Sequence, residues 1–140
     1  MVKMKDRVRF VETDMMGVVH HANYFRWFEM GRVEYMRQAG VLLHDLMSAG
    51  YLFPIVDVGC VYKKSAKFDD DIVICTELLE LSRVKMKYKY KIKLLLDDSL
   101  LAEGFTVNLF TKMDGSVARI PPNFYSRLEN FYKQKTGGKQ

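Results

Sequence analysis

Residues 23–39 have the pattern of a helix that is apolar around most of its circumference. The segment contains no proline, and it begins at Asn23, which suits an N-cap, and precedes Gly40, which suits the C′ position. Its bulky apolar residues are Tyr24, Phe25, Trp27, Phe28, Met30, Val33, Tyr35 and Met36, and a narrow polar stripe is expected at Arg26, Glu29, Arg32 and Arg37. Such a helix must be buried on most sides. Because it is the one long internal helix that the chain predicts, a sheet has to curl around it.

The segment from Arg83 to Leu94 alternates strictly between basic residues at odd positions and apolar residues at even positions. Side chains alternate between the two faces of a strand, so the pattern predicts a strand with one basic and one apolar face. A helix would distribute these lysines around its circumference. We expect the apolar face of this strand to lie against the helix.

Further strands are predicted on both sides of this one. Stretches that alternate or are rich in β-branched and aliphatic residues lie at 4–11, 55–62, 72–81 and 105–111, and turns are predicted at 69–71, 97–99 and 114–116. Short connections after residue 55 predict an antiparallel meander. A short helix at 44–49, a final amphipathic helix at 124–132 and a mobile polar tail at 133–140 complete the prediction. The expected fold class is α+β.

The composition indicates a folded domain in a reducing compartment. A chain of 140 residues, 49% hydrophobic and 13% aromatic, is expected to form one domain, here residues 1–132, and not a disordered chain. Its two cysteines make no disulfide framework. No apolar run reaches the roughly 20 residues that cross a bilayer, and the first residues do not resemble a signal peptide. A cytoplasmic protein without a membrane span is therefore expected.

The polar connection at residues 12–24 is where chemistry is expected. It carries Asp14, the permissive Gly17, and His20-His21 directly before the helix. Unpaired N–H groups at a helix N-terminus can stabilise the oxygen of a reacting carbonyl, and a carboxylate facing them can activate water or attack directly. These residues suffice for a minimal hydrolytic site for an acyl compound. The structural alternative is an Asx turn at Asp14 and a helix cap at Asn23.

The same connection does not have the pattern of a metal site. Neighbouring histidines such as His20 and His21 do not share a helix face, and no Cys/His cluster in the sequence completes a zinc spacing. We therefore expect neither a metal nor another cofactor.

The run Thr-Asp-Met-Met-Gly-Val-Val-His-His-Ala-Asn-Tyr at 13–24 resembles the signature of hotdog-fold acyl-CoA thioesterases. The branch is that of 4-hydroxybenzoyl-CoA thioesterase and the YbgC-like proteins. Arg32-Val33-Glu34-Tyr35 resembles the family's Arg-x-Glu-aromatic step, and Ser-Ala-Lys-Phe-Asp-Asp at 65–70 resembles a later turn of the family. The resemblance covers about residues 4–132. It implies an antiparallel sheet of about five strands wrapped around one central helix, as the helix at 23–39 requires by itself.

The resemblance also implies the roles of individual residues. Asp14 takes the role of catalytic carboxylate, as general base or nucleophile, and the main-chain N–H of His21 polarises the thioester carbonyl. Residues expected to hold the substrate or the helix start are Gly17, Val19, Asn23, Tyr24 and Arg83. His20 departs from the family, which more often has tyrosine there. The implied reaction is hydrolysis of an acyl-CoA to a free acid and coenzyme A. The alternative is a hotdog protein that binds acyl-CoA or acyl carrier protein without hydrolysis.

The family works as dimers whose paired sheets place the site at the subunit boundary, often assembling into tetramers, so a homodimer or homotetramer is implied. A pocket walled by Phe25, Phe28 and Met30 would suit medium chains or aromatic acids equally. Glu34 is expected to pair with Arg37 or Arg32, or else to be functional.

The basic stripe at residues 83–93 has three interpretations. Six basic residues and no acidic one lie within it, so the rest of this chain of net charge +5 is close to neutral. The stripe is a solvated outer sheet face, a landing surface for the phosphates of coenzyme A or an acidic carrier protein, or a nucleic-acid surface. For a phosphate, Arg83 is the expected ligand. Nucleic acid is not expected, because Tyr88 and Tyr90 point to the face opposite the lysines.

Overall fold

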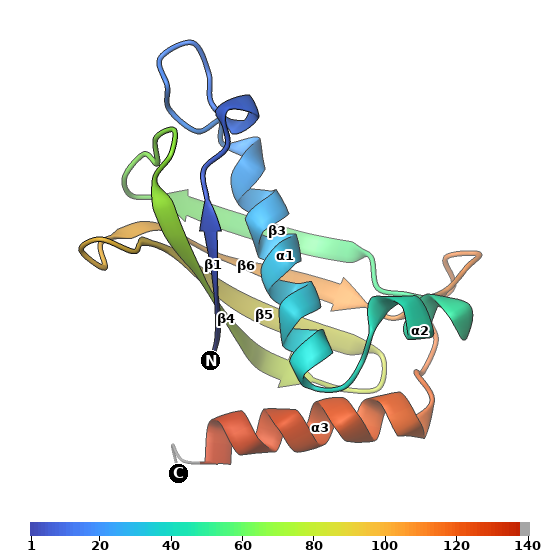
Figure 1. The fold of residues 1–140 in the computed structure, drawn as a ribbon. Coiled ribbons are helices and arrows are strands. Elements are labelled where there is room, and N and C mark those ends of the chain that lie inside the picture. The colour runs from blue at the N-terminus through green and yellow to red at the C-terminus, as the bar shows by residue number, and fades with distance from the viewer. Residues whose placement is uncertain (138–140) are drawn as a thin grey trace.

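The computed structural model describes residues 1–137 of the chain. Within them a five-stranded antiparallel sheet curls around one long helix, α1 (Ala22–Gln38), as Figure 1 shows. The sheet consists of β1 (Val2–Arg7), β3 (Ile55–Tyr62), β4 (Asp71–Leu81), β5 (Lys85–Leu94) and β6 (Leu100–Leu109). The smaller elements are a 3₁₀ turn at Phe10–Glu12, α2 (Leu43–Ser48), α3 (Pro122–Gly137), and the two-residue strands β2 (Tyr51–Leu52) and β7 (Thr111–Lys112), which pair with each other. The predicted α+β class is confirmed.

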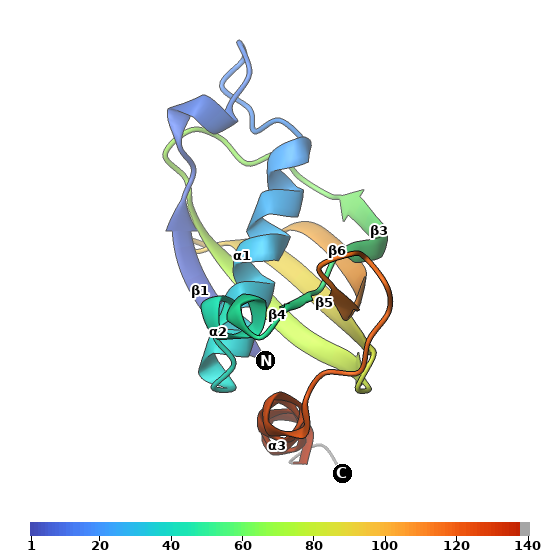
Figure 2. The ribbon, with the colours of Figure 1, turned by 90° about the vertical axis from the view of Figure 1, so that its right-hand side faces the viewer.

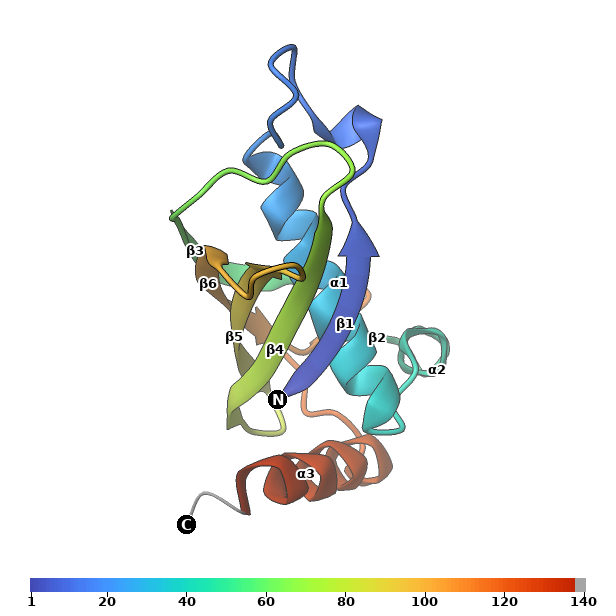
Figure 3. The same ribbon diagram turned by 60° about the vertical axis from the view of Figure 1, so that its left-hand side comes forward.

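The order of the strands corrects the predicted meander. Strands β4, β5 and β6 do follow one another, but the sheet runs β1-β4-β5-β6-β3, so β3 pairs with β6 and not with β4. The connection from β3 to β4, residues 63–70, therefore crosses the sheet, passing over the first turn of α1 (Figure 3). Its backbone groups bond to the loop before α1: the Val19 amide donates to the Ala66 carbonyl and the Phe68 amide to the Gly17 carbonyl.

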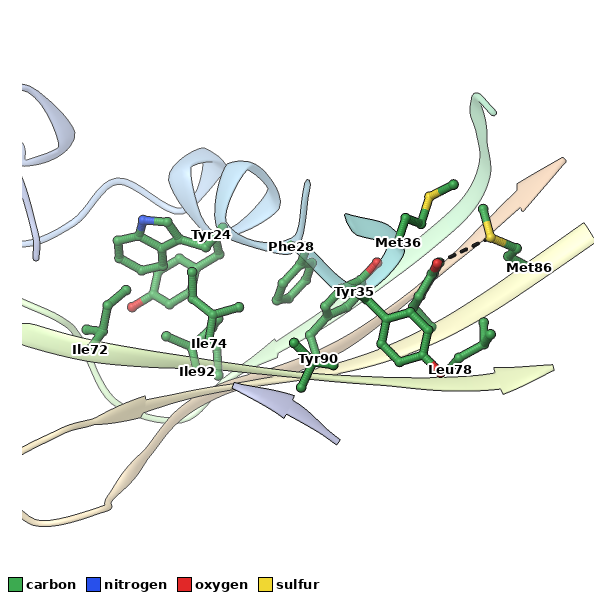
Figure 4. Packing of buried hydrophobic residues seen from close by; sticks show 14 of the residues in the cluster. Tyr24, Phe28, Tyr35, Met36, Ile72, Ile74, Leu78, Met86, Tyr90 and Ile92 are labelled. Carbon is green, nitrogen blue, oxygen red and sulfur yellow. Dashed lines mark hydrogen bonds between the residues drawn. The ribbon is translucent and has the colours of Figure 1, made fainter. Parts of the chain in front are cut away.

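α1 is held by close packing of its inner side against the sheet. Trp27, Phe28 and Tyr35 are fully buried, and the Phe28 ring stacks on Tyr90 of β5 with centroids 4.4 Å apart (Figure 4). Gly31 lets the helix approach β4, because a Cβ atom at this position would lie 2.2 Å from Thr76 Oγ1. The prediction that Arg32 belongs to the polar stripe of the helix is wrong. Arg32 is buried, and its Nη1 lies 3.4 Å from the Tyr90 hydroxyl oxygen.

Several element ends differ from the predicted ones. The first strand ends at Arg7, because the chain turns into the 3₁₀ helix and leaves Phe10 exposed. The strand predicted at 105–111 corresponds to β6, which starts earlier, at Leu100, and ends at Leu109. The final helix continues past residue 132 to Gly137, so residues 133–137 of the expected mobile tail are helical, and residues 138–140 lie outside the described part.

α3 closes the end of the sheet that lies away from the loop before α1 (Figure 2). The Tyr132 hydroxyl donates to the Leu79 carbonyl at 3.0 Å, and the Phe131 ring packs on Tyr35 with centroids 5.0 Å apart. The described residues contain no helix that is both long enough and apolar enough to cross a membrane.

The alternating strand is confirmed as β5, with its predicted faces. Its even residues Met86, Tyr88, Tyr90 and Ile92 are fully buried. Of the lysines on the other face, Lys85 pairs with Glu80, Lys89 with Glu103 and Lys93 with Asp98, at 3.1–3.5 Å. These pairs agree with a solvated outer sheet face. The buried tyrosines are not accessible for stacking on bases.

Candidate functional site

The loop between the 3₁₀ turn and α1 is a tight, well-bonded turn. The Asp14 amide donates to the Val18 carbonyl, and the Gly17 amide donates to the Asp14 carbonyl. Gly17 has φ +76°, a conformation that favours glycine. The crossing connection holds the loop from the other side, because the Val19 amide donates to the Ala66 carbonyl at 2.9 Å. The segment at 65–70, which resembles a family turn, therefore supports the loop that carries the family signature.

The Asp14 carboxylate is exposed at this turn. Its Oδ1 accepts the amide of Met16 at 2.8 Å and that of Val18 at 3.3 Å, which is the predicted Asx turn. Within residues 1–137, Oδ2 has no hydrogen-bond partner. The structural and the functional interpretations of Asp14 are thus compatible: one oxygen orients the carboxylate and the other is available for chemistry.

His21 is the N-cap of α1 and has helical backbone angles. The Ala22 amide donates to His20 Nδ1, and the amides of Asn23 and Tyr24 donate to the carbonyls of His20 and His21. Among the described residues the His21 amide has no acceptor. It is therefore a free donor at the start of α1, at the position that the resemblance assigns to the oxyanion site.

Asn23 is not the N-cap that the sequence predicts. The helix begins one residue earlier, at Ala22, and the Asn23 side chain donates its amide hydrogens to the carbonyls of Glu12 at 3.0 Å and His20 at 3.2 Å. It acts as a donor to the loop and not as an acceptor for the helix, so it still fixes the helix start.

Val19 and Tyr24 are buried in the core. The Tyr24 hydroxyl accepts the Ala66 amide at 3.3 Å, and burial raises the pKa of this phenol. Both side chains place the loop and present little surface to a ligand.

Arg83 lies at the other end of β4 from the loop (Figure 1). Its Nε and Nη2 donate to the Ile120 carbonyl at 3.2 and 2.9 Å. This side chain thus anchors the segment that leads to α3, and it lies at the opposite end of the sheet from the loop that carries Asp14.

Tyr62, at the end of β3, is a neighbour of His21 that no sequence signal indicated. The two rings stack with centroids 4.2 Å apart, and the Tyr62 hydroxyl donates to the His21 carbonyl at 3.3 Å. Burial is the main cause that raises the pKa of Tyr62 to about 12, so the hydroxyl keeps its proton at neutral pH. Tyr62 therefore fixes the His21 peptide from outside the helix.

The surroundings of Asp14 are apolar and exposed. The exposed residues are Phe10, Val11, Met15, Met16 and Phe68, with Met15 entirely accessible. Phe10 and Phe68 pack edge to face with ring centroids 5.7 Å apart, and exposed apolar patches mark contact sites for a ligand or a partner. Met15 and Met16 are part of this exposed surface, and their flexible side chains can adapt to the shape of a ligand.

Cavities of about 420 and 440 Å³ lie farther along α1. One is lined by Met4, Arg26, Glu29, Met30, Val33 and Glu34, and the other by Glu29, Arg32, Val33, Leu43 and residues 52–55. Neither is lined by Asp14 or His21. The sequence predicts a pocket walled by Phe25, Phe28 and Met30. Of these residues, Met30 lines the first cavity, whereas Phe25 is partly exposed and Phe28 is buried against Tyr90.

Glu34 forms an ion pair with Arg37, which was one of the two alternatives predicted for it. Arg37 donates to both of its carboxylate oxygens at 2.8 and 2.6 Å, and Gln38 donates at 2.7 Å. These hydrogen bonds lower the pKa of Glu34 to about 2. Arg32, the other expected partner, does not take part in this cluster.

Glu34 should therefore stabilise the fold at neutral pH but not in strong acid. Because its pKa is lower in the folded state, its contribution is present above pH about 4.5 and is lost as the pH falls towards 2. Since the pair is partly exposed, Glu34→Gln should lower the free energy of unfolding by about 1 kcal/mol at pH 7. Urea unfolding of both proteins should show this difference shrinking at about pH 3. An equal difference at both pH values would contradict the ion pair.

Among residues 1–137 there is no group of three or more His, Cys, Asp or Glu side chains that could hold a metal ion. The chemistry open to this site is that of one carboxylate oxygen and one free amide.

Known proteins are similar to this chain both in sequence and in fold. The family model of the thioesterase-like superfamily matches residues 8–128. YneP of Bacillus subtilis is 38% identical over 90 residues, a match that covers 64% of this chain and 65% of YneP. The acyl-CoA thioesterase YbgC of Haemophilus influenzae is 30% identical over 74% of each chain. The structure of a DHNA-CoA thioesterase from Staphylococcus aureus superposes with a TM-score of 0.86 at 28% identity, covering 98% of this chain and 93% of that one.

Proposed function

The chain belongs to the thioesterase-like superfamily and has its hotdog fold, and on this premise we propose that it hydrolyses acyl-CoA thioesters at Asp14 and the start of α1. The observation that carries the proposal is that one short loop holds both an exposed carboxylate with a free oxygen, at Asp14, and a free amide at the start of α1, at His21. The activities in the names of the Haemophilus influenzae and Staphylococcus aureus relatives support it.

In this proposal the thioester carbonyl oxygen accepts a hydrogen bond from the His21 amide. The negative charge that develops on this oxygen is stabilised by that amide and by the positive end of α1. Tyr62 and His20 support the site by holding the peptide unit between His21 and Ala22, which directly follows the proposed donor.

Asp14 Oδ2 then acts in one of two ways. As a base it takes a proton from water, whose oxygen attacks the carbonyl carbon while the carbon–sulfur bond breaks and the thiolate of coenzyme A leaves. As a nucleophile it attacks the carbon itself, the carbon–sulfur bond breaks and the thiolate of coenzyme A leaves, and water then cleaves the resulting anhydride to the free acid and the Asp14 carboxylate. Both routes give a free acid and coenzyme A, and both need the carboxylate charge.

The test is release of coenzyme A thiol from a panel of straight-chain acyl-CoAs, benzoyl-CoA and 4-hydroxybenzoyl-CoA. Turnover that follows Michaelis–Menten kinetics on part of the panel supports hydrolysis, and its profile identifies the acid. Tight binding without turnover on the whole panel would overturn it in favour of a protein that binds acyl groups, including those on acyl carrier protein.

We also propose that the working form is a homo-oligomer joined along β3. The two edges of the sheet differ: β1 carries Lys3, Lys5 and Arg7, which discourage pairing, whereas β3 exposes Ile55, Val56, Val58 and Val61. An apolar edge strand is a template for a second copy of the same strand. Such pairing would place a partner beside Tyr62, and hence beside His21.

Val58→Lys should therefore separate the oligomer into monomers, because it puts a charge into the shared edge. Light scattering coupled to size exclusion measures the mass, and Lys5→Ala on the β1 edge is the matched control that should keep the wild-type mass. A Val58→Lys protein with wild-type mass would show that the copies meet elsewhere.

A further inference from the structure

Glu12 is a fully buried carboxylate that precedes Asp14 by two residues; it is 1% exposed. Its Oε1 accepts the Arg9 amide at 2.6 Å, and its Oε2 pairs with Arg26 Nη2 on α1. A buried carboxylate of this kind is stable only while its partners remain. Glu12 therefore holds the base of the Asp14 loop to a fixed point on α1.

The main chain of Glu12 contacts the residues on either side of His21, whose amide is the proposed oxyanion donor. Its carbonyl accepts the His20 amide at 2.9 Å and the Asn23 side-chain amide at 3.0 Å. These donors belong to residues before and after His21. One residue thus bonds to both flanks of the proposed oxyanion donor and, through the chain, positions the proposed carboxylate.

Arg26 completes the connection from the helix. It lies five residues after His21, and its side chain is 45% exposed. No other charge partner of Arg26 lies within 4.0 Å in the described residues. Its position is therefore set by Glu12. Glu12 Oε2 also lies 4.0 Å from Arg9 Nη1, so Arg26 is the partner that ties Glu12 to α1, while Arg9 holds it within the 3₁₀ turn.

From these contacts we infer that Glu12 and Arg26 are a positioning pair for hydrolysis, which sets the separation of the Asp14 carboxylate from the His21 amide. The inference rests on the proposed function of those two groups. Neither member of the pair touches the substrate. The pair acts on kcat, because an error of about 1 Å between reacting groups reduces the rate by about 100-fold.

The test uses Arg26 variants, because the Arg26 side chain is partly exposed, and thermal unfolding checks that each variant is folded before its kcat is compared. With the acyl-CoA of the panel that the wild type hydrolyses fastest, Arg26→Met should lower kcat by about 100-fold and leave KM within about twofold. Arg26→Lys, which returns a positive charge to Glu12, should regain most of kcat. A role in packing alone would treat methionine and lysine alike. Equal kcat values for these two variants would overturn the inference.

Glu12→Gln probes the other member, since glutamine keeps the shape and can still accept the Arg9 amide. It should lower kcat to a similar extent, and the double variant Glu12→Gln/Arg26→Met should be no slower than the slower single variant, because both changes break one interaction. Glu34→Gln is the matched control: it breaks an ion pair on the same helix that does not reach the loop, and kcat should stay at the wild-type value.

The result for Asp14 separates this inference from the proposed function. If Asp14→Asn is inactive while Glu12→Gln and Arg26→Met turn over at the wild-type rate, the inference alone is wrong. If Asp14→Asn is as active as the wild type, the site lies elsewhere and both are wrong.

Discussion

Asp14→Asn should lower kcat for acyl-CoA hydrolysis by about 1,000-fold and leave the fold unchanged. Asparagine keeps an oxygen that can accept the Met16 and Val18 amides, so the turn persists. What is lost is the negative charge on the oxygen that has no other partner. Both chemical routes need that charge, so the loss is expected whether Asp14 acts on water or on the thioester. Thiol release at saturating substrate measures kcat.

The control for this variant is another aspartate with the same local geometry. Asp114 Oδ1 accepts the Ser116 amide at 2.9 Å in the turn after β7, in the same Asx arrangement as Asp14. Asp114→Asn should keep wild-type kcat, because this turn lies outside the loop at the start of α1. An Asp14→Asn protein that retains more than about a tenth of the wild-type kcat would exclude Asp14 as base and as nucleophile.

Gly31→Ala should lower the free energy of unfolding by about 2 kcal/mol, the other large effect that we expect. Alanine favours a helix over glycine by about 1 kcal/mol, so an exposed position would be stabilised by the change. Here the added Cβ would lie 2.2 Å from Thr76 Oγ1 and 3.1 Å from Ile74 Cγ2. α1 would have to move away from β4, which disturbs the packing of the fully buried rings on this side of the helix.

Thr76→Ala removes the closest of these atoms and provides the matched second variant. Thr76 Oγ1 is buried and has no hydrogen-bond partner in the described residues, so its removal alone breaks no bond. In the double variant most of the lost stability should return, as measured by urea unfolding. If Gly31→Ala is as stable as the wild type, the approach of α1 to β4 is not what requires glycine at this position.

Periodicity in the sequence predicted the elements that have one buried face. The strict alternation from Arg83 to Leu94 identified β5 and both of its faces, and the apolar segment at 23–39 identified α1. These signals are local, since burial of every second residue, or of most of a helix, is recorded in neighbouring residues. The order of the strands is not recorded in this way. The position of β3 beside β6 depends on where residues 63–70 cross, and the meander prediction was wrong for that reason.

In the candidate site, too, residues with a local sequence signal were predicted and residues that depend on distant contacts were not. Asp14, Gly17 and His21 follow from the loop composition and the family signature, and the turn they were expected to form is present. Glu12 and Tyr62 were missed. Glu12 looks like one of many charged residues before a loop, and only its partner on α1 shows that it is buried. Tyr62 reaches His21 from a strand 41 residues away, a contact that no pattern in a single sequence indicates.

The crossing connection has a consequence for how the chain acquires its native state. Helix α1 and the hairpins of β4, β5 and β6 form from contacts between near neighbours, which close quickly. The loop that carries Asp14 is instead held by partners far along the chain, such as Ala66, whose carbonyl accepts the Val19 amide at 2.9 Å. Closing such long segments is entropically unfavourable until the sheet is in place. We therefore expect the loop that carries Asp14 to become ordered late in folding, after the sheet and α1 have formed.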